Sequence, residues 1–152
     1  MSQDRAGIHL ESSLGYLLKE ASSALRAAME AELRPLGMTV THYSCLELLA
    51  QRPGLSNSEL ARGAFVTRQS MNVLLQALER DGYVTRPPHA PVGKALPTRL
   101  TPRGRQSLER ASAAVRSVEI RMLRGLTEDE QSSAFRALQS MTRALRAVED
   151  GA

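Results

Sequence analysis

The sequence of 152 residues lacks the side chains that sheet-rich proteins use most. It contains no Trp, and aromatic residues make up only 3% of the chain. This composition disfavours a core built from strands, because strands are enriched in aromatic and β-branched residues. Hydrophobic residues nevertheless make up 42% of the sequence. We therefore predict one compact domain or two small lobes, with a mainly helical core of Leu, Ala, Val and Met.

Cysteine and long apolar runs are also scarce. Cys45 is the single cysteine, which excludes a disulfide within the chain and favours a reducing compartment, although a disulfide between two copies stays open. The N-terminal stretch "MSQDRAGIHLESSLG" carries acidic and polar residues where a secretion signal needs an apolar run. No stretch approaches the roughly 18 apolar residues of a membrane span. These absences predict a cytoplasmic protein with no membrane partner.

Patterns that carry catalysis or bind metals are missing too. The sequence has no carboxylate pair, zinc-ligand spacing or glycine-rich phosphate loop. His42 and Cys45 lie three residues apart on a predicted helix, but no third group is evident that would orient the histidine. Cys45 fits a small buried core residue, and the alternative of a redox sensor requires exposure and a lowered pKa. We expect a protein that is not an enzyme and holds neither cofactor nor metal.

Positive charge is concentrated in one segment. The net charge of the chain is +4, but residues 62–105 contain eight Lys or Arg and two acidic residues, a local net charge of +6. A basic segment of this kind is expected of a surface that meets a polyanion. The alternative is a solvated basic face without a partner.

Helical periodicity divides the first half of the chain into three elements. From about Leu10 to Leu33, apolar residues recur in steps of three and four, and "RPLGM" ends this long helix. The stretch "THYSCLELLAQRPG" predicts a shorter helix that ends at the Pro-Gly pair. In "SNSELARGA", Ser56 and Glu59 have capping-box spacing and predict a third helix.

The helix predicted after Thr67 has two unlike faces. Its first turns carry Arg, Gln, Ser and Asn, whereas an apolar stripe at helical spacing suits burial. Thr67 is expected to cap the helix, with Val66 outside it, and Gly82 to end it in a left-handed conformation. Two short helices joined by a tight turn form a helix-turn-helix. The stripe consists of Met71, Leu74, Leu75 and Leu78.

The rest of the chain predicts a hairpin and two more helices. The run "YVTRPPHAPVGKALPTRLT" suits a proline-rich β-hairpin, and Pro102 is expected at the first position of the next helix. Thr127 and Glu130 form a second capping box, which opens the last helix. A second copy of the chain can bury the apolar stripes of the terminal helices, because twofold dimers are the commonest oligomers. A monomeric bundle is the alternative.

The order of these motifs resembles the multiple-antibiotic-resistance regulator (MarR) family of bacterial winged-helix repressors. The resemblance spans nearly the whole chain and rests on "LSNSELARGAFVTRQSMNVLLQALERDGYVTRP" and the closing "RLTPRGRQSL". It implies a mainly α fold with a small β-wing: residues 37–101 form a winged helix-turn-helix, and residues 1–36 and 102–152 form a helical dimerisation region. The helix at 67–80 would lie in the DNA major groove, and the wing would contact the minor groove.

The resemblance places DNA recognition at the tip of that helix. The residue types agree, because Arg can bond guanine bidentately, Gln and Asn can read adenine, and Ser and Thr can hold phosphate. A helix N-terminus adds its own attraction for phosphate. The alternative is that these side chains merely face water. The predicted DNA-binding residues are Ser56, Thr67, Arg68, Gln69, Ser70, Asn72, Gln76, Arg86, Lys94 and Arg99.

The predicted wing departs from the family pattern. The family usually carries an acidic residue and two arginines in the hairpin, whereas this chain has "HAPVGKA", with Val92 and Gly93 at the positions of the acid and the first arginine. Lys94 alone keeps a charge. We therefore expect the wing to contribute mainly a nonspecific attraction for phosphate.

These observations predict a homodimeric DNA-binding transcriptional regulator, namely a ligand-released repressor that recognises a pseudo-palindromic operator. The resemblance implies small aromatic acids or phenols as effectors, with Tyr16, His42 and Tyr43 as candidate lining residues of their pocket. The alternative function is a winged-helix module that binds a protein partner without sequence-specific DNA binding.

Overall fold

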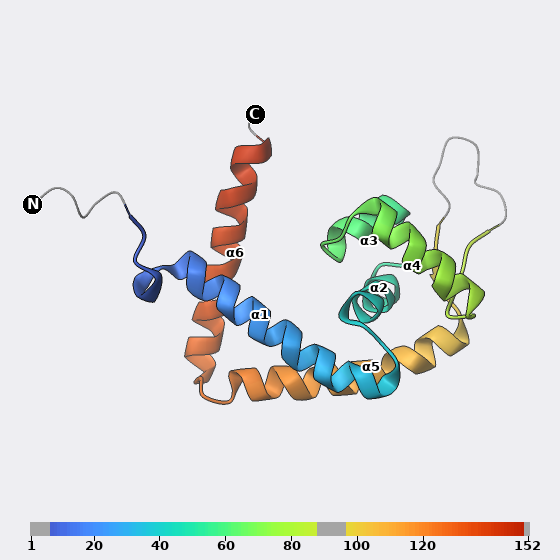
Figure 1. Ribbon diagram of the computed structural model, residues 1–152, viewed down its shortest axis with the longest axis horizontal. Helices are drawn as coiled ribbons and strands as arrows, with labels where there is room; N and C mark the ends of the chain where they lie inside the picture. The colour runs from blue at the N-terminus through green and yellow to red at the C-terminus, as the bar shows by residue number, and fades with distance from the viewer. Residues whose placement is uncertain (1–6, 88–96, 151–152) are drawn as a thin grey trace, which may run out of the picture. The chain divides into compact units, whose positions relative to one another are not determined.

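The computed structural model describes residues 7–87 and 97–150, with side chains described up to residue 147. The chain separates into two compact units, of which unit 1 ends at Val118 and unit 2 begins at Glu119. A mainly helical chain with one small sheet confirms the predicted fold class (Figure 1). The elements are η1 (Leu10–Ser12), α1 (Leu14–Leu33), η2 (Arg34–Leu36), α2 (Val40–Gln51), α3 (Asn57–Gly63), α4 (Arg68–Arg80), β1 (Val84–Thr85), β2 (Arg99–Leu100), α5 (Pro102–Leu123) and α6 (Glu128–Asp150).

Local capping signals set where the helices begin. Ser56 and Glu59 form a complete capping box at the start of α3, as predicted. At α6, Thr127 and Glu130 exchange the same two hydrogen bonds, over 3.0 and 3.2 Å. The first long helix begins later than the predicted start at about Leu10: α1 starts at Leu14, because Ser13 adopts an extended conformation and caps α1 with its side chain. Each cap satisfies a backbone N–H that has no partner inside its own helix.

The strands β1 and β2 pair antiparallel, with Val84 opposite Leu100 and Thr85 opposite Arg99. Val84 and Leu100 face the core, whereas Thr85 and Arg99 point away from it. This pairing confirms the base of the predicted hairpin. The loop that joins the strands, including Val92, Gly93 and Lys94, lies outside the described residues.

Unit 1 has one hydrophobic core, which lies beneath the helix-turn-helix. Helix α3 contacts both α2 and α4. Of the two strands, β1 packs on α4 and β2 packs on α2. The apolar stripe of α4 is buried as predicted at three of its four positions, and Leu74 is half-buried. The core therefore holds α4 by one face and leaves the other face open. Its buried members from α2, α3 and α4 are Cys45, Leu46, Leu49, Leu60, Ala61, Met71, Leu75 and Leu78.

Unit 2 consists of the last turn of α5 and the whole of α6. The helix α6 carries Phe135 and Leu145 with 65% and 74% of their surface exposed. An apolar groove of about 580 Å³ runs along the unit, lined among others by Met122, Leu123 and Leu138. Unit 2 by itself therefore leaves an apolar helix face uncovered.

Candidate nucleic-acid interface

The exposed face of α4 carries the polar side chains that the sequence singled out. Thr67, Arg68, Gln69, Ser70, Asn72 and Gln76 are all exposed. The opposite face of the same helix is packed into the core at Met71, Leu75 and Leu78. Since those buried contacts fix the rotation of α4 about its axis, the polar residues project together into solvent.

The N-terminus of α4 is closed by a small network around Thr67. Its Oγ1 accepts a hydrogen bond from the backbone N–H of Ser70 over 3.0 Å, which confirms Thr67 as the N-cap. The same hydroxyl donates to Ser70 Oγ, also over 3.0 Å. The network ties the first turn to its cap, and the other N–H groups of that turn have no partner inside the helix and point out of its end. That arrangement attracts a phosphate, because the helix dipole is positive there.

Asn57, which sequence reasoning missed, joins α3 to the tip of α4. Its Nδ2 donates to the backbone carbonyl of Arg68 over 3.2 Å, across eleven positions of sequence. The Asn57 Oδ1 atom is buried and has no hydrogen-bond partner among the described residues. This contact positions the first residue of α4 against α3. No local pattern signals it, because it depends on how the two helices pack.

Ser56 has a structural task at the start of α3. Its hydroxyl accepts from the backbone N–H of Glu59 over 3.3 Å, and Glu59 Oε1 accepts from the backbone N–H of Ser56 over 3.2 Å. The hydrogen bonds with Ser56 hold the pKa of Glu59 below its ordinary value. Ser56 is half-buried. If Ser56 contacts DNA as predicted, its hydroxyl must bind a phosphate while it also caps α3.

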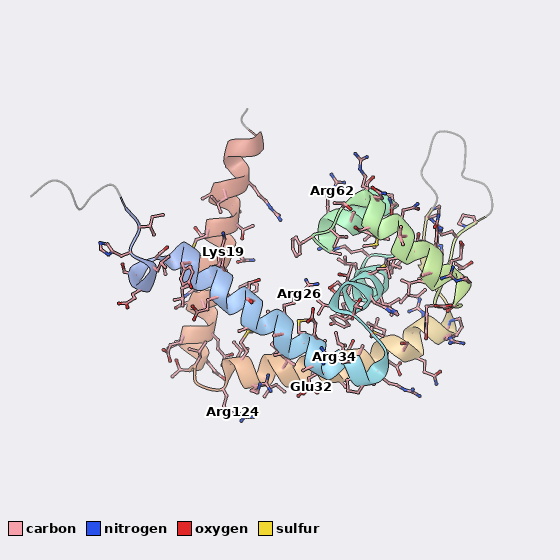
Figure 2. All side chains as sticks on the ribbon, viewed as in Figure 1. Lys19, Arg26, Glu32, Arg34, Arg62 and Arg124 are labelled. Carbon is pink, nitrogen blue, oxygen red and sulfur yellow. The ribbon has the colours of Figure 1, made fainter. Side chains whose placement is uncertain are left out.

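The turn between α3 and α4 has a strained residue at its centre. Phe65 has a φ of 60°. The Phe65 N–H donates to the Arg62 carbonyl, and the Val66 N–H donates to the Ala61 carbonyl. These two bonds form a Schellman motif, whose left-handed position is usually glycine. The Phe65 ring is 83% exposed. Arg62, labelled in Figure 2, adds an exposed cation in the last turn of α3.

The two described arginines of the hairpin, Arg86 and Arg99, differ in exposure and in their partners. Arg86 donates from Nη2 to Glu79 Oε1 over 3.4 Å, and its side chain is only 17% exposed. Arg99 is exposed on β2, on the side that faces away from the core. Arg86 therefore ties the strand to the end of α4, whereas Arg99 is open to a partner. Lys94 lies outside the described residues.

The three candidate effector-lining residues lie on two helices. Tyr16 of α1 is 45% exposed. Tyr43 of α2 is half-buried and packs against the core. His42 of α2 meets the ring of Tyr83 edge-on, with 5.5 Å between the centroids. Burial lowers the pKa of His42, and the charge of Asp81 partly opposes this shift.

Cys45 is fully buried in the core of unit 1. Burial raises the pKa of its thiol to about 12. A thiol with such a pKa stays protonated near neutral pH, and the thiolate is the reactive form. The structure thus favours the interpretation of Cys45 as a core residue over that of a redox sensor.

The described residues contain neither a metal-ligand cluster nor a helix that could span a membrane. No group of three or more His, Cys, Asp or Glu side chains there is arranged to hold a metal ion. In the same part of the chain, every helix is too short or too polar to cross a membrane.

The chain resembles a group of bacterial regulators in both sequence and structure. A sequence profile described as "MarR family" matches residues 36–95. The HTH-type transcriptional repressor Rv2887 of Mycobacterium tuberculosis is 44% identical over 135 residues, which cover 89% of this chain and 97% of that protein.

Solved structures of Rv2887 match the fold. Its complex with DNA has a TM-score of 0.71 and 43% identity, and covers 86% of this chain and 98% of that chain. Its complex with salicylic acid has a TM-score of 0.71 and 45% identity, and covers 86% of this chain and 96% of that chain. The similarity thus extends over both the helix-turn-helix and most of the remaining helices.

Proposed function

The chain belongs to the MarR family, and on that premise we propose that it is a homodimeric transcriptional repressor that binds a pseudo-palindromic DNA site and is released by a small molecule. A relative with 44% identity is named a transcriptional repressor, and its structures contain DNA or salicylic acid. A protein of this kind acts on DNA by binding rather than catalysis, and we place it in the cytoplasm. Residues 1–36 and 102–152 would serve dimerisation, and residues 37–101 would bind DNA.

The observation that carries the proposal is the exposed polar tip of α4. Thr67 and Asn57 fix that tip, and the buried stripe fixes its rotation, so Arg68, Gln69 and Asn72 are presented on a rigid scaffold. A fixed helix favours base reading, because the backbone that carries these side chains does not have to be ordered on binding. Within this surface we assign Arg68, Gln69, Asn72 and Gln76 to base edges, and Ser56, Thr67, Ser70, Arg86, Lys94 and Arg99 to phosphates.

A gel-shift titration on the intergenic DNA upstream of the gene tests this function. We expect a saturable complex with two half-sites about one helical turn apart, roughly 34–36 Å. Arg68→Ala should weaken it by about tenfold or more, on the order of 1–3 kcal/mol, and relax specificity at one position in each half-site. The control is Arg116→Ala, which removes an equal charge from an exposed position of α5. If the wild type bound this DNA no more tightly than unrelated DNA, the protein-interaction module would replace the repressor.

A further inference from the structure

A single large apolar side chain is exposed on the helices of the helix-turn-helix. Val73 of α4 has 61% of its surface exposed. Within α2, α3 and α4, all of whose residues the structure describes, no other large apolar side chain is exposed. Burial therefore stabilises Val73 little, and a β-branched residue is also a weaker helix former than alanine. Neither the core nor the helix itself explains a valine at this position.

Val73 lies on the line of α4 that points away from the core. The residues of this line recur in steps of four, three and four positions, which places them one above another on a helix: Gln69, Val73, Gln76 and Arg80. All four are exposed, and the buried stripe of α4 lies on the opposite side of the helix. Val73 is thus the one member of this line whose side chain cannot form a hydrogen bond.

In the proposed complex, α4 lies in the major groove with this line towards the base edges. Val73 stands one turn beyond Gln69, about 6 Å further along the helix axis. Successive base pairs are about 3.4 Å apart, so the two side chains reach different base pairs. Val73 therefore meets a base edge of its own, between the positions of Gln69 and Gln76.

Thymine is the base whose edge suits a valine. In the major groove, guanine presents two acceptors, cytosine a donor, and adenine one of each, whereas thymine presents its C5 methyl group beside one acceptor. A valine set against a polar edge removes water from that edge and returns no hydrogen bond, which is unfavourable. Against the methyl group of thymine, the same valine buries apolar surface on both partners. Val73 therefore favours thymine over the other bases.

The side chains around Val73 favour the same kind of base pair. Gln69, Asn72 and Gln76 carry amides, which can bond adenine through its N6 and N7 atoms. Asn72 precedes Val73 directly and is exposed like it. Each adenine that an amide reads brings a thymine on the opposite strand. A valine among amides therefore lies close to thymine methyl groups.

We propose that Val73 contacts the C5 methyl group of one thymine in each half-site, and is a specificity-determining residue of α4. The assignment rests on the proposed function, because it requires α4 to lie in the major groove. It adds a preference that no hydrogen bond of the neighbouring amides supplies, since a methyl group is recognised only by direct apolar contact.

Deoxyuridine tests the assignment, because it differs from thymidine only in lacking the methyl group. Each duplex of a series carries the site of the gel shift with one thymine of one half-site replaced. Replacement at one position should weaken binding of the wild type about fourfold, the effect of one buried methyl group. Val73→Ala, whose Cβ atom stops short of that group, should lose most of this response. Alanine is the better helix former at an exposed position, so the variant should keep its fold.

Gln69→Ala is the matched control, because it shortens another side chain of the same line to alanine. It should weaken binding, yet keep the wild-type response to deoxyuridine at the position assigned to Val73. A second pair of duplexes carries cytosine or 5-methylcytosine at that position, opposite guanine. The wild type should bind the methylated duplex about fourfold more tightly than the unmethylated one, and Val73→Ala should bind the two alike.

The outcomes separate this assignment from the proposed function. A wild-type complex that responds to no deoxyuridine substitution would overturn the assignment alone, and so would an equal response in Val73→Ala. Failure of the wild type to bind the unmodified DNA more tightly than unrelated DNA would overturn the proposed function, and the contact of Val73 with thymine would fall with it.

Discussion

At the scale of the residue, Phe65 stands out because it violates two preferences at once. In the part of the chain that the structure describes, it alone among residues other than glycine has a positive φ. Its ring is also 83% exposed, so burial does not offset the strain. A residue other than glycine in this region costs on the order of 1–3 kcal/mol. Phe65 thus lowers the stability of the helix-turn-helix at the turn that precedes α4.

We predict that Phe65→Gly makes the protein more stable. Glycine relieves the backbone strain of the folded state. It also gives the unfolded chain more conformational freedom, which offsets part of this gain. The net increase in the free energy of unfolding should be about 0.5–1 kcal/mol. Urea titration measures the change. Phe65→Ala is the control, because alanine keeps the Cβ atom that causes the strain and should leave the stability nearly unchanged. A loss of stability in Phe65→Gly would mean that the ring is buried in the protein as it exists in solution.

At the scale of the element, the side chain of Thr101 ties together the junction between α4, the hairpin and α5. Thr101 Oγ1 donates to the Gly82 carbonyl over 2.6 Å and accepts from the Gly104 N–H over 3.1 Å. Gly82 has a φ of 84° and ends α4 as predicted. Gly104 is buried in the first turn of α5, and an added Cβ atom there would overlap the carbonyl oxygen of Tyr83. The first turn of α5 therefore lies against the chain that leaves α4.

Gly104→Ala should accordingly force α5 away from Tyr83 and destabilise unit 1. We expect a loss of about 1–3 kcal/mol, the usual cost of placing an extra methyl group in a packed interior. The melting temperature and the urea midpoint report this loss. Gly15→Ala serves as the comparison, because Gly15 lies in helix α1 with ordinary space around it and should gain stability by roughly 0.5–1 kcal/mol. A Gly104→Ala protein as stable as the wild type would show that the junction has room to relax.

At the scale of the whole molecule, apolar side chains remain exposed in each unit. In unit 1 they include Leu14 and Leu17 of α1, which are 70% and 56% exposed, and in unit 2 they include Phe135 and Leu145 of α6. Soluble monomers seldom leave such helix faces uncovered. The proposed homodimer gives these faces a partner, because a twofold interface buries the same surface on both copies.

We predict that sedimentation at micromolar concentration gives twice the chain mass of 16.6 kDa. Leu145→Glu should shift the protein towards the monomer, because a charge would then have to be buried in the interface. Ser140→Glu is the matched control, since Ser140 is exposed on the opposite face of α6 and should leave the dimer intact. An equal shift in both variants would place the contact elsewhere, and a monomeric wild type would contradict the proposed assembly.

The sequence by itself determined the elements whose signals act over a few residues. Ser56, Thr67 and Thr127 were predicted as caps because a side-chain oxygen reaches the N–H groups of the turn that follows it. Gly82 was predicted to end the helix because glycine, which has no Cβ atom, adopts the left-handed conformation with less strain than other residues. The stripe of α4 was read from helical spacing, and the order of these motifs was enough to indicate the family. These features are local, so they survive without knowledge of the packing.

Only the tertiary structure decided which distant residues meet. Asn57 reaches the carbonyl of Arg68, and Tyr83 lies between His42 and Arg103, although these partners are separated by 11 to 41 positions. Such contacts depend on how whole helices pack, and residue spacing along the chain does not predict that packing. Phe65 escaped prediction for the related reason that its φ is set by the helices on either side of the turn.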